Sequence, residues 1–413
     1  MTMPNVKIDL DAEEMASQDE VAAIEEEWKT PSIQRDKLWA MLNSHLESGT
    51  CEKTFGTTEP TIVSQMVKHQ QTVYVYGAPC GLSEVQHPGC DHADYPWDPV
   101  PKVIDKIVKA LLWHDQRQKQ FRMHHTKADR EKFENYDFMA PLVADGDMGF
   151  GGLTTTVKLA RSFVEAGVAM IHLDDLAIGL KKFTVGERRT VVPTSEYLTR
   201  LTAVRMQFDI MGTNTLLMCR CDTDRSQFIT STIDPRDHEY IIGATNGVEP
   251  LIEAILTGMS NGQTVKGKAT EQQYQEYASK AKACGISLRY KRQVAKSKDW
   301  RMTVWKDIAE FHTEVRKVYP NRLFAFGFTE QIRSSNDDMA KLGIVWQAQP
   351  IWAVGGLNIT AEKFAKEWQR DGIAGYIETI SKPSRLPPIV DGFHRRSYAG
   401  SNLADAFFAA VVG

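Results

Sequence analysis

Carboxylate side chains end two of the apolar runs in this chain and recur in a loop that follows a third run. Asp145 and Asp147 stand two residues apart in VADGDMGFGG, and Asp174 lies near the end of IHLDD. Asp91 belongs to DHADYP, in the loop that follows TVYVYG. Because alternate residues of a strand project to the same face, Asp145 and Asp147 are expected to point the same way. These four acids are the residues best suited to chemistry.

Carboxylates that converge on one edge repel one another unless a hard cation lies among them, and oxygen ligands select Mg²⁺ or Mn²⁺. The glycines of 146–152 let the backbone turn tightly and approach a ligand. A simpler alternative is that each acid caps a following helix, as Asp at a strand–helix junction commonly does. Taken as a set, with the glycine pattern, the acids favour a metal site. The sequence therefore predicts a metal site among the acids of these three segments, VADGDMGFGG, IHLDD and DHADYP.

The elements that must position these acids are short β-rich runs that alternate with helical stretches. The runs lie at 55–58, 72–77, 140–147, 169–175, 216–222, 322–328 and 344–354. Such alternation predicts a parallel sheet with right-handed crossovers. In a closed (β/α)₈ barrel the active site lies at the carboxyl ends of the strands, and the acids stand at those ends. We therefore predict an α/β fold of the (β/α)₈ TIM-like barrel type.

Three segments are expected along the chain. Residues 1–50 read as an N-terminal helical arm, residues 51–360 as the barrel, and residues 361–413 as a helical tail suited to oligomerisation. The barrel contains a polar helical insert at about 247–300, in which Gly285–Tyr290 is the candidate for a degraded barrel strand. Cys219 and Cys221 alternate with Arg220 and are expected to point away from it into the core.

Composition excludes several classes of protein. The chain has 413 residues, 42% of them hydrophobic, and a formal net charge of -4, so it lacks the basic character of a nucleic-acid binder. No run approaches the ~18 apolar residues of a membrane span. The six cysteines form no CxxC pair, and the N-terminus is acidic, unlike a leader peptide. These features predict a cytoplasmic protein with neither a nucleic-acid nor a membrane partner.

Longer motifs give the chain a specific resemblance. ADGDMGFGG and HLDD are similar to two acidic strand ends of isocitrate lyases, and PTSEYLTRLTAVRMQFDIMG, CRCD and IDPRDHEYIIGATN resemble fungal or plant-type members closely. TVYVYG, DHADYP and HRRSYAGSNLADAF extend the similarity to most of the chain. The chain therefore resembles the isocitrate lyase family, within the isocitrate lyase and phosphoenolpyruvate mutase superfamily.

The resemblance implies a role for several residues. The family's metal environment falls on Asp91, Asp145, Asp147 and Asp174, with Asp174 standing where the family has Glu. Arg220 matches the arginine that holds a substrate carboxylate, a task that suits its guanidinium fork. Tyr74 and His172 match active-site positions. Lys181 and Lys182 match the start of the family's mobile catalytic loop.

That loop then departs from the family. Where the family reads Lys-Lys-Cys-Gly-His, this chain reads Lys181-Lys182-Phe183-Thr184-Val185. The family cysteine supplies the proton that quenches the aci-carboxylate product, and Phe183 carries no ionisable proton. The neighbouring histidine has become Val185.

The substrate pocket departs as well. The family's Ser-Gly-Trp is here Tyr76-Gly77-Ala78, and its succinate-binding run aligns with a segment containing Gly327 and Thr329. The family strand Trp-Met-Glu has no counterpart. Losing hydrogen bonds to a carboxylate costs about 1.5–3 kcal/mol each, so efficient isocitrate cleavage is not expected.

Two functions remain open from the sequence. One is a divergent Mg²⁺-dependent lyase or hydrolase that acts on a 2-oxo or 2-hydroxy acid, or on a larger substrate of specialised metabolism. The other is an inactive relative with a structural or regulatory role, favoured by the missing strand. In both, the resemblance implies a homodimer or homotetramer, and the enzyme would bind a small carboxylate-type molecule. The catalytic candidates are Tyr74, Lys181, Lys182 and Thr184, and the substrate-binding candidates are Tyr76, Gly77, Ala78, His172, Arg220, Gly327 and Thr329.

Overall fold

The computed structural model describes residues 31–89, 93–123, 125–133, 135–179, 190–221 and 228–231, shorter stretches up to residue 349, residues 352–382, and residues 408 and 411. The shorter stretches are 233–234, 236–237, 241–244, 288–290, 324–327, 340–341 and 343–349. In chain order the elements are α2 (Pro31–Ser48), β1 (Glu52–Phe55), α3 (Pro60–Met66), β2 (Val73–Val75), α4 (Gly77–Ser83), α5 (Pro99–Met123), α6 (Lys127–Arg130), β3 (Leu142–Asp145), α7 (Leu153–Glu165), β4 (Met170–Leu173), β5 (Thr190–Val191), α8 (Thr194–Ile210), β6 (Leu216–Cys219), β7 (Phe228–Ile229), β8 (Ile241–Ala244), β9 (Leu288–Tyr290), β10 (Phe324–Gly327), β11 (Ile344–Gln349), α13 (Trp352–Tyr376) and the π-helix η2 (Ile377–Ser381).

Parallel strands form the centre of the molecule. One sheet has the order β2-β3-β4-β6 and another the order β1-β11-β10, and every pairing within these two sheets is parallel. Strand β1 contacts β2, which places the two sheets edge to edge. A Cβ on Gly56 would lie 1.5 Å from the carbonyl oxygen of Tyr74, so only glycine allows this approach. The fold class is the predicted α/β barrel type.

Residues of β2 illustrate how the alternation of a strand divides the core into two layers. Val73 and Val75 pack with the helices, whereas Tyr74 and Tyr76 belong to a separate buried cluster that also contains Trp346. Trp346 lies edge-on to Tyr74, with ring centroids 5.7 Å apart, and its indole N–H donates to Thr72 Oγ1 at 3.0 Å. This inner cluster forms an aromatic floor (Tyr74, Tyr76 and Trp346) on the inner side of the strands.

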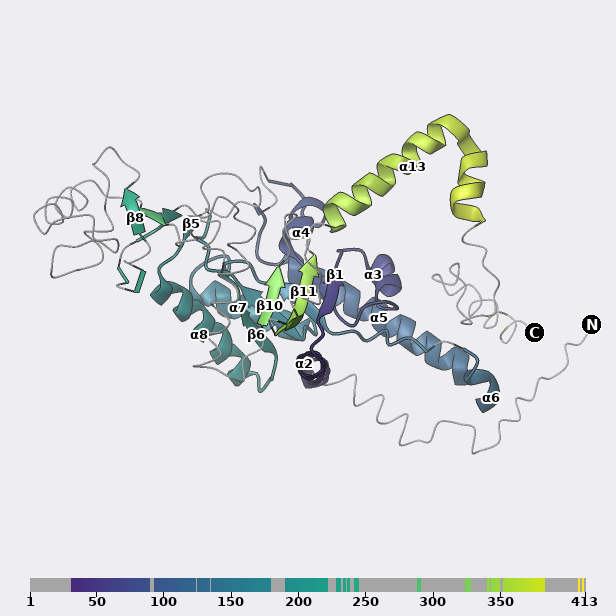
Figure 1. Ribbon diagram of the computed structural model, residues 1–413, viewed down its shortest axis with the longest axis horizontal. Helices are drawn as coiled ribbons and strands as arrows, with labels where there is room; N and C mark the ends of the chain where they lie inside the picture. The colour runs from purple at the N-terminus through teal and green to yellow at the C-terminus, as the bar shows by residue number, and fades with distance from the viewer. Residues whose placement is uncertain are drawn as a thin grey trace, which may run out of the picture.

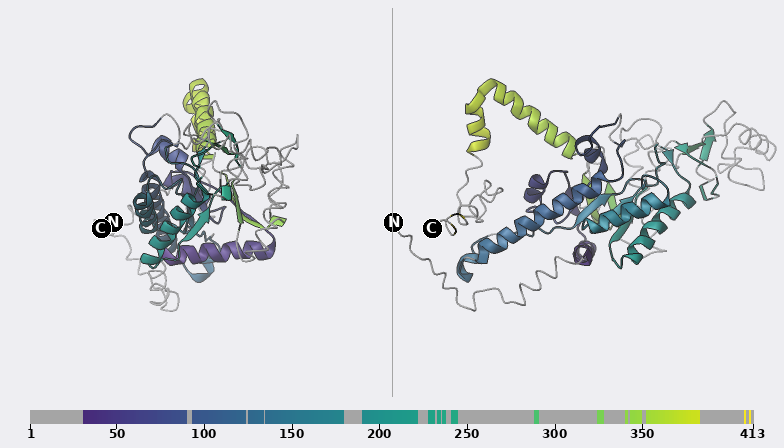
Figure 2. Two further views of the ribbon diagram at one scale, coloured as in Figure 1. Left: turned by 90° about the vertical axis from the view of Figure 1, so that its left-hand side faces the viewer. Right: turned by 180° about the vertical axis from the view of Figure 1, so that it is seen from behind.

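Helices cover the outer side of β2, β3, β4 and β6. Apolar residues at helical spacing on α5 and α7, such as Ile104 with Ile107 and Leu159 with Phe163, are fully or almost fully buried against the strands. Figure 2 shows α5, α7 and α8 together on this side of the strands. Helix α2 instead lies across the amino ends of the strands, where Leu38 packs into the inner cluster (Figure 1). The opposite, carboxyl ends of the strands are left for the site.

Several sequence-based boundaries differ from the structure. The run expected at 55–58 is strand β1 at Glu52–Phe55, and the run expected to reach Val354 ends at Gln349, because α13 begins at Trp352. The expected barrel–tail boundary at 360 falls inside α13. Apolar residues continue from the end of β11 into α13 and also across residue 360, so hydrophobicity alone marks neither of these two boundaries.

The proposed degraded barrel strand was also placed wrongly. Leu288–Tyr290 forms β9, which runs antiparallel between β7 and β8 in a small separate sheet of order β5-β7-β9-β8. It therefore does not belong to the parallel barrel strands. Cys219 and Cys221 were expected in the core, but both are exposed. Strand β6 ends at Cys219, and its last residue is exposed, so no described element buries these cysteines.

Within the described part of the chain, no helix is both long enough and apolar enough to cross a membrane. Helix α13 is long but amphiphilic, and it is kinked at Gly372, whose φ of 56° and ψ of -138° interrupt the helical geometry. It leads away from the strands before it turns at this kink (Figure 1).

Candidate functional site

Three of the four predicted metal ligands lie at the carboxyl ends of two neighbouring strands. Asp145 is the last residue of β3 and pairs in register with His172 of β4. Asp147 and Asp174 follow the same two strands. The three aspartates are 5%, 1% and 0% exposed, respectively, which is rare for carboxylates. Burial of several negative charges in one place requires compensating charge or hydrogen bonds.

Backbone hydrogen bonds hold the acidic loop after β3. Asp145 accepts the N–H of Asp147 on Oδ1 at 2.9 Å, and the N–H of Asp174 donates to the carbonyl of Asp147 at 2.7 Å. Asp174 in turn accepts the N–H of Leu176 at 3.3 Å. These are turn-stabilising bonds rather than helix caps, because α7 begins after Gly152 without a side-chain cap. The simple helix-cap alternative therefore does not account for Asp145.

The same loop contains two residues that are not glycine in the left-handed region. Asp147 has φ 47° and Phe150 has φ 58°. This conformation costs an L-residue roughly 1–2 kcal/mol, and such residues cluster at functional sites. The loop is thus held in an unfavourable geometry at the point where the buried acids gather.

A buried tyrosine and a buried histidine lie beside the acids. The Tyr74 hydroxyl is 2.7 Å from His172 Nε2, and His172 Nδ1 is 3.6 Å from Asp145 Oδ1. Arg220 Nη1 approaches Asp145 Oδ2 at 3.9 Å from the end of β6. Burial, together with the charge of Asp145, raises the pKa of the Tyr74 phenol well above its ordinary value. The phenol therefore stays protonated at neutral pH.

The residues after β2 close in on the acids. The N–H of Gly77 donates to Asp145 Oδ2 at 3.2 Å. A Cβ on Gly77 would lie 1.6 Å from the Tyr95 hydroxyl and 2.7 Å from Asp147 Oδ2, so the position requires glycine. Ala78 is buried, and Tyr76 stacks on Tyr74 with centroids 5.6 Å apart and planes 11° apart. The Tyr76 ring is therefore part of the inner cluster that also contains Ala78.

The remaining predicted site residues are placed only in part. Gly327 ends strand β10. Asp91, Lys181, Lys182, Thr184 and Thr329 lie outside the described residues. Over the described part of the chain, no three His, Cys, Asp or Glu side chains form a group that could hold a metal ion. Asp145, Asp147 and Asp174 carry oxygen atoms of the kind that a hard cation prefers, but these three side chains do not by themselves form such a group, and Asp91 lies outside the described residues.

One residue near the site was missed by sequence reasoning. Tyr197, in the first turn of α8, places its hydroxyl 2.8 Å from the carbonyl of Leu173 and 2.9 Å from that of Arg220. Leu173 is the last residue of β4, and Arg220 follows the last residue of β6. The contact joins residues 24 and 23 positions apart in the chain, so no local spacing indicated it.

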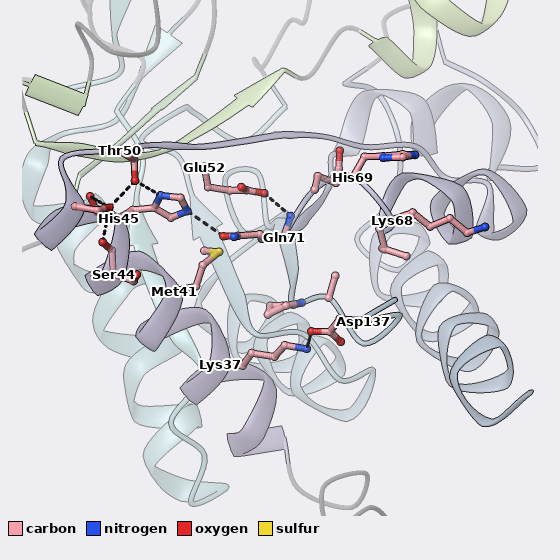
Figure 3. Close-up of a pocket in the computed structure, with 15 residues that line it drawn as sticks. Lys37, Met41, Ser44, His45, Thr50, Glu52, Lys68, His69, Gln71 and Asp137 are labelled. Atoms are coloured by element: carbon pink, nitrogen blue, oxygen red, sulfur yellow. Dashed lines mark hydrogen bonds and ion pairs between the residues drawn. The ribbon is translucent and has the colours of Figure 1, made fainter. Parts of the chain in front are cut away.

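A cavity of about 650 Å³ lies at the other end of the strands, between α2 and the amino ends of β1 to β3 (Figure 3). Its polar side chains bond to one another. His45 Nε2 is 2.9 Å from Gln71 Oε1, Glu52 accepts the N–H of Gln71 at 2.8 Å, and Lys37 pairs with Asp137. These contacts tie α2 to the strands, and we assign no ligand to the cavity.

The chain is similar to known proteins both in sequence and in structure. The model of the isocitrate lyase family matches residues 5–322. A mitochondrial 2-methylisocitrate lyase of Schizosaccharomyces pombe is 40% identical and is covered over 98% of both chains. An isocitrate lyase of Oryza sativa subsp. japonica is 29% identical over 91% of this chain and 82% of its own. These similarities confirm the resemblance predicted from the motifs.

Solved structures share the fold at low sequence identity. Oxaloacetate acetylhydrolase, in complex with 3,3-difluorooxalacetate, gives a TM-score of 0.53 at 14% identity over 93% of this chain and 98% of that one. A trigonal crystal form of 2,3-dimethylmalate lyase, a member of the PEP mutase/isocitrate lyase superfamily, gives 0.52 at 14% identity over 91% and 95%.

The alignment with the S. pombe protein also reveals gaps. It spans 508 positions, whereas this chain has 413 residues, so at least 95 positions of that alignment face gaps in this chain.

Proposed function

Because this chain belongs to the isocitrate lyase family, we propose that it is a divergent lyase-type enzyme that depends on Mg²⁺ or Mn²⁺. The observation that carries the proposal is the burial of Asp145, Asp147 and Asp174 at the ends of adjacent strands. Carboxylate oxygens are the ligands that Mg²⁺ and Mn²⁺ prefer, so a divalent cation suits a group of buried aspartates at the ends of adjacent strands. The expected substrate is a 2-oxo or 2-hydroxy acid, or a larger molecule of specialised metabolism that carries this group.

The ion would be held by Asp91, Asp145, Asp147 and Asp174, and it would stabilise negative charge on the oxygens of the substrate. Arg220, at the end of β6, would bind a substrate carboxylate through its guanidinium. The substrate would lie over the aromatic floor.

Tyr74 and His172 form a buried hydrogen-bonded pair beside the acids. The 2.7 Å contact lets the imidazole and the phenol share one proton, and burial keeps that proton from bulk water. We propose that this pair supplies or accepts the proton in place of the missing family cysteine. Lys181, Lys182 and Thr184 remain catalytic candidates from the resemblance, and Tyr76, Gly77, Ala78, Gly327 and Thr329 remain substrate-binding candidates.

Efficient isocitrate cleavage is not the proposed activity. Phe183 stands where the family has its acid, and the succinate-binding run has changed. The 40% identity to the S. pombe protein favours 2-methylisocitrate as a second candidate substrate. The remaining alternative is an inactive relative with a structural or regulatory role.

The function is tested by turnover of purified protein with Mg²⁺ on 2-methylisocitrate, oxaloacetate, 2,3-dimethylmalate and isocitrate, with Asp145→Ala as the matched control. We expect cleavage of at least one of the first three at a rate well above that of isocitrate, and loss of that activity in the control. Absence of turnover on all four, together with absence of Mn²⁺ binding, would leave the inactive alternative.

We also propose that the chain forms a homodimer or homotetramer. Helix α13 exposes Ile359 and Ile373, at 67% and 63%, on a segment that leads away from the strands (Figure 1). Apolar side chains this exposed are commonly covered by another protein surface. Light scattering coupled to gel filtration should give two or four times the mass of the chain, and a monomer would contradict this proposal.

We propose a cytoplasmic location and no nucleic-acid or membrane partner. The support is the modest net charge of -4 and the six cysteines, which form no CxxC pair. The S. pombe relative is named as mitochondrial, so a fluorescent fusion should distinguish the two compartments.

A further inference from the structure

The Tyr197 hydroxyl links the ends of two site-bearing strands. It lies 2.8 Å from the carbonyl of Leu173 and 2.9 Å from the carbonyl of Arg220. The Leu173 carbonyl also accepts the N–H of Arg220 at 2.9 Å, as the last bond between β4 and β6. A single phenol proton therefore serves both carbonyls at the point where the two strands reach the site.

The position of Arg220 depends on the Tyr197 hydroxyl more than the positions of the acids do. It lies one residue past the end of β6, and its side chain is 32% exposed. The Tyr197 hydroxyl bonds the carbonyl of Arg220 itself, whereas neither of its two partners belongs to Asp174, whose N–H donates to the carbonyl of Asp147 at 2.7 Å. Loss of the Tyr197 hydroxyl should therefore disturb the guanidinium more than the acidic side chains.

The position of Tyr197 is itself fixed from outside the strands. Asp237 Oδ2 accepts the N–H of Thr194 at 3.0 Å, and Asp234 Oδ2 accepts the N–H of Ser195 at 2.7 Å. Both aspartates are 5% exposed. Two carboxylates on the first free N–H groups of α8 satisfy these donors and complement the helix dipole. Asp234 and Asp237 thus anchor the helix turn that carries Tyr197.

We propose that Tyr197 is a positioning residue, which holds the Arg220 backbone at the end of β6 so that the guanidinium meets the carboxylate of the substrate. This role rests on the proposed function, because it assumes that Arg220 binds a carboxylate near the ion. It gives a purpose to the PTSEY and IDPRD motifs, which the proposed function leaves unused.

The test compares Tyr197→Phe with wild type in two titrations. Mn²⁺ alone is titrated by the paramagnetic resonance of the free ion, and oxalate is titrated calorimetrically in saturating Mn²⁺. We expect oxalate to bind about tenfold more weakly to the variant, which is the loss of roughly one hydrogen bond to the group that orients Arg220. Mn²⁺ affinity should stay within about threefold, and the unfolding midpoint should fall only slightly.

Two further variants separate positioning from general destabilisation. Tyr136→Phe removes a phenol hydroxyl from a half-buried residue away from the acids and should leave both affinities unchanged. In an Arg220→Lys background, adding Tyr197→Phe should weaken oxalate binding no further, because the two residues act in one unit. If Tyr197→Phe does not fold, Asp237→Asn loosens the same helix turn and should weaken oxalate binding in the same selective way.

The outcomes distinguish this role from the proposed function. A wild-type protein that binds neither Mn²⁺ nor oxalate overturns the proposed function and the role of Tyr197 with it. A wild-type protein that binds both, with Tyr197→Phe indistinguishable from it, overturns only the role of Tyr197. Equal losses of Mn²⁺ and oxalate affinity, or additive effects in the Arg220→Lys background, also overturn it.

Discussion

Replacing Asp147 by Asn should make the metal-free protein more stable and the metal-loaded protein less so. Asn has the shape of Asp, and it tolerates the left-handed φ of 47° that this position requires. The substitution therefore removes a buried charge while it preserves the backbone. The effect of this substitution on the free energy of unfolding should therefore change sign when metal is added, and a simple loss of packing cannot produce such a change.

The magnitude in the metal-free state follows from the repulsion between Asp145 and Asp147. Both side chains are buried and a single residue separates them along the chain, and at an effective dielectric constant near 20 two charges about 6–8 Å apart repel by about 2–3 kcal/mol. Arg220, 3.9 Å from Asp145, offsets part of this repulsion. We expect Asp147→Asn to raise the free energy of unfolding by about 1–2 kcal/mol without metal.

In the presence of metal the order should reverse. A cation at about 100 times its dissociation constant stabilises the folded state by about 2.7 kcal/mol. Asp147→Asn should lose most of this gain, because the ion loses a charged ligand. The assay is the thermal unfolding midpoint of both proteins in EDTA and in excess Mg²⁺ or Mn²⁺.

Asp137→Asn is the matched control. Asp137 is an exposed carboxylate that pairs with Lys37 at the amino ends of the strands, so its replacement should alter stability equally with and without metal. If wild type gains nothing from either cation, and Asp147→Asn is no more stable than wild type in EDTA, then the buried acids are not a metal site and the electrostatic reasoning is wrong.

Three further predictions follow from other contacts. Gly77→Ala should abolish Mn²⁺ binding and lower the unfolding midpoint, because its methyl group would meet the Tyr95 hydroxyl at 1.6 Å; unaltered binding in a titration would show that this loop can shift. Phe183→Cys should not produce isocitrate cleavage, since the succinate-binding run has also changed, and a coupled glyoxylate assay with strong turnover would contradict this expectation. Burial lowers the pKa of His114 from 6.5 to about 4, so the unfolded state binds more protons between these values and stability should fall as the pH drops from about 6.5 to 4. Urea titrations at both ends of this range measure how far the free energy of unfolding falls with pH. His114→Leu should reduce that fall by up to about 3 kcal/mol, and an unchanged fall would show that other groups cause it.

The parallel strands could be predicted because each is a short apolar run. The runs around Tyr74, Asp145, His172 and Arg220 all became parallel strands, and β2, β3 and β4 are buried along their whole length, whereas β6 is half-buried or exposed. The strand alternation expected to place Asp145 and Asp147 on one face does not extend to Asp147, because β3 ends at Asp145 and Asp147 has a φ of 47°. Sequence was therefore informative where the pattern is local and the burial is two-sided.

The small sheet could not be predicted in this way. Strands β5 and β7 have two residues each, which is too short for any periodicity, and β7 pairs with both β5 and β9, which come from distant segments. Cys219 illustrates a related limit: alternation gives the face of a strand, but not whether another element covers that face. Tyr197 was missed because its contacts are long-range and end on backbone carbonyls, which leave no trace in the side-chain pattern.

The aromatic floor places an optical signal directly beneath the site. Trp346 is 3% exposed and lies edge-on to Tyr74, whose hydroxyl contacts His172. Its emission should respond to any ligand that reorients this ring or its hydrogen bond to Thr72, whereas indoles farther from the acids should stay constant. Although the chain has nine tryptophans, subtracting the spectrum of Trp346→Phe would isolate this one, so that binding can be followed before a substrate is known.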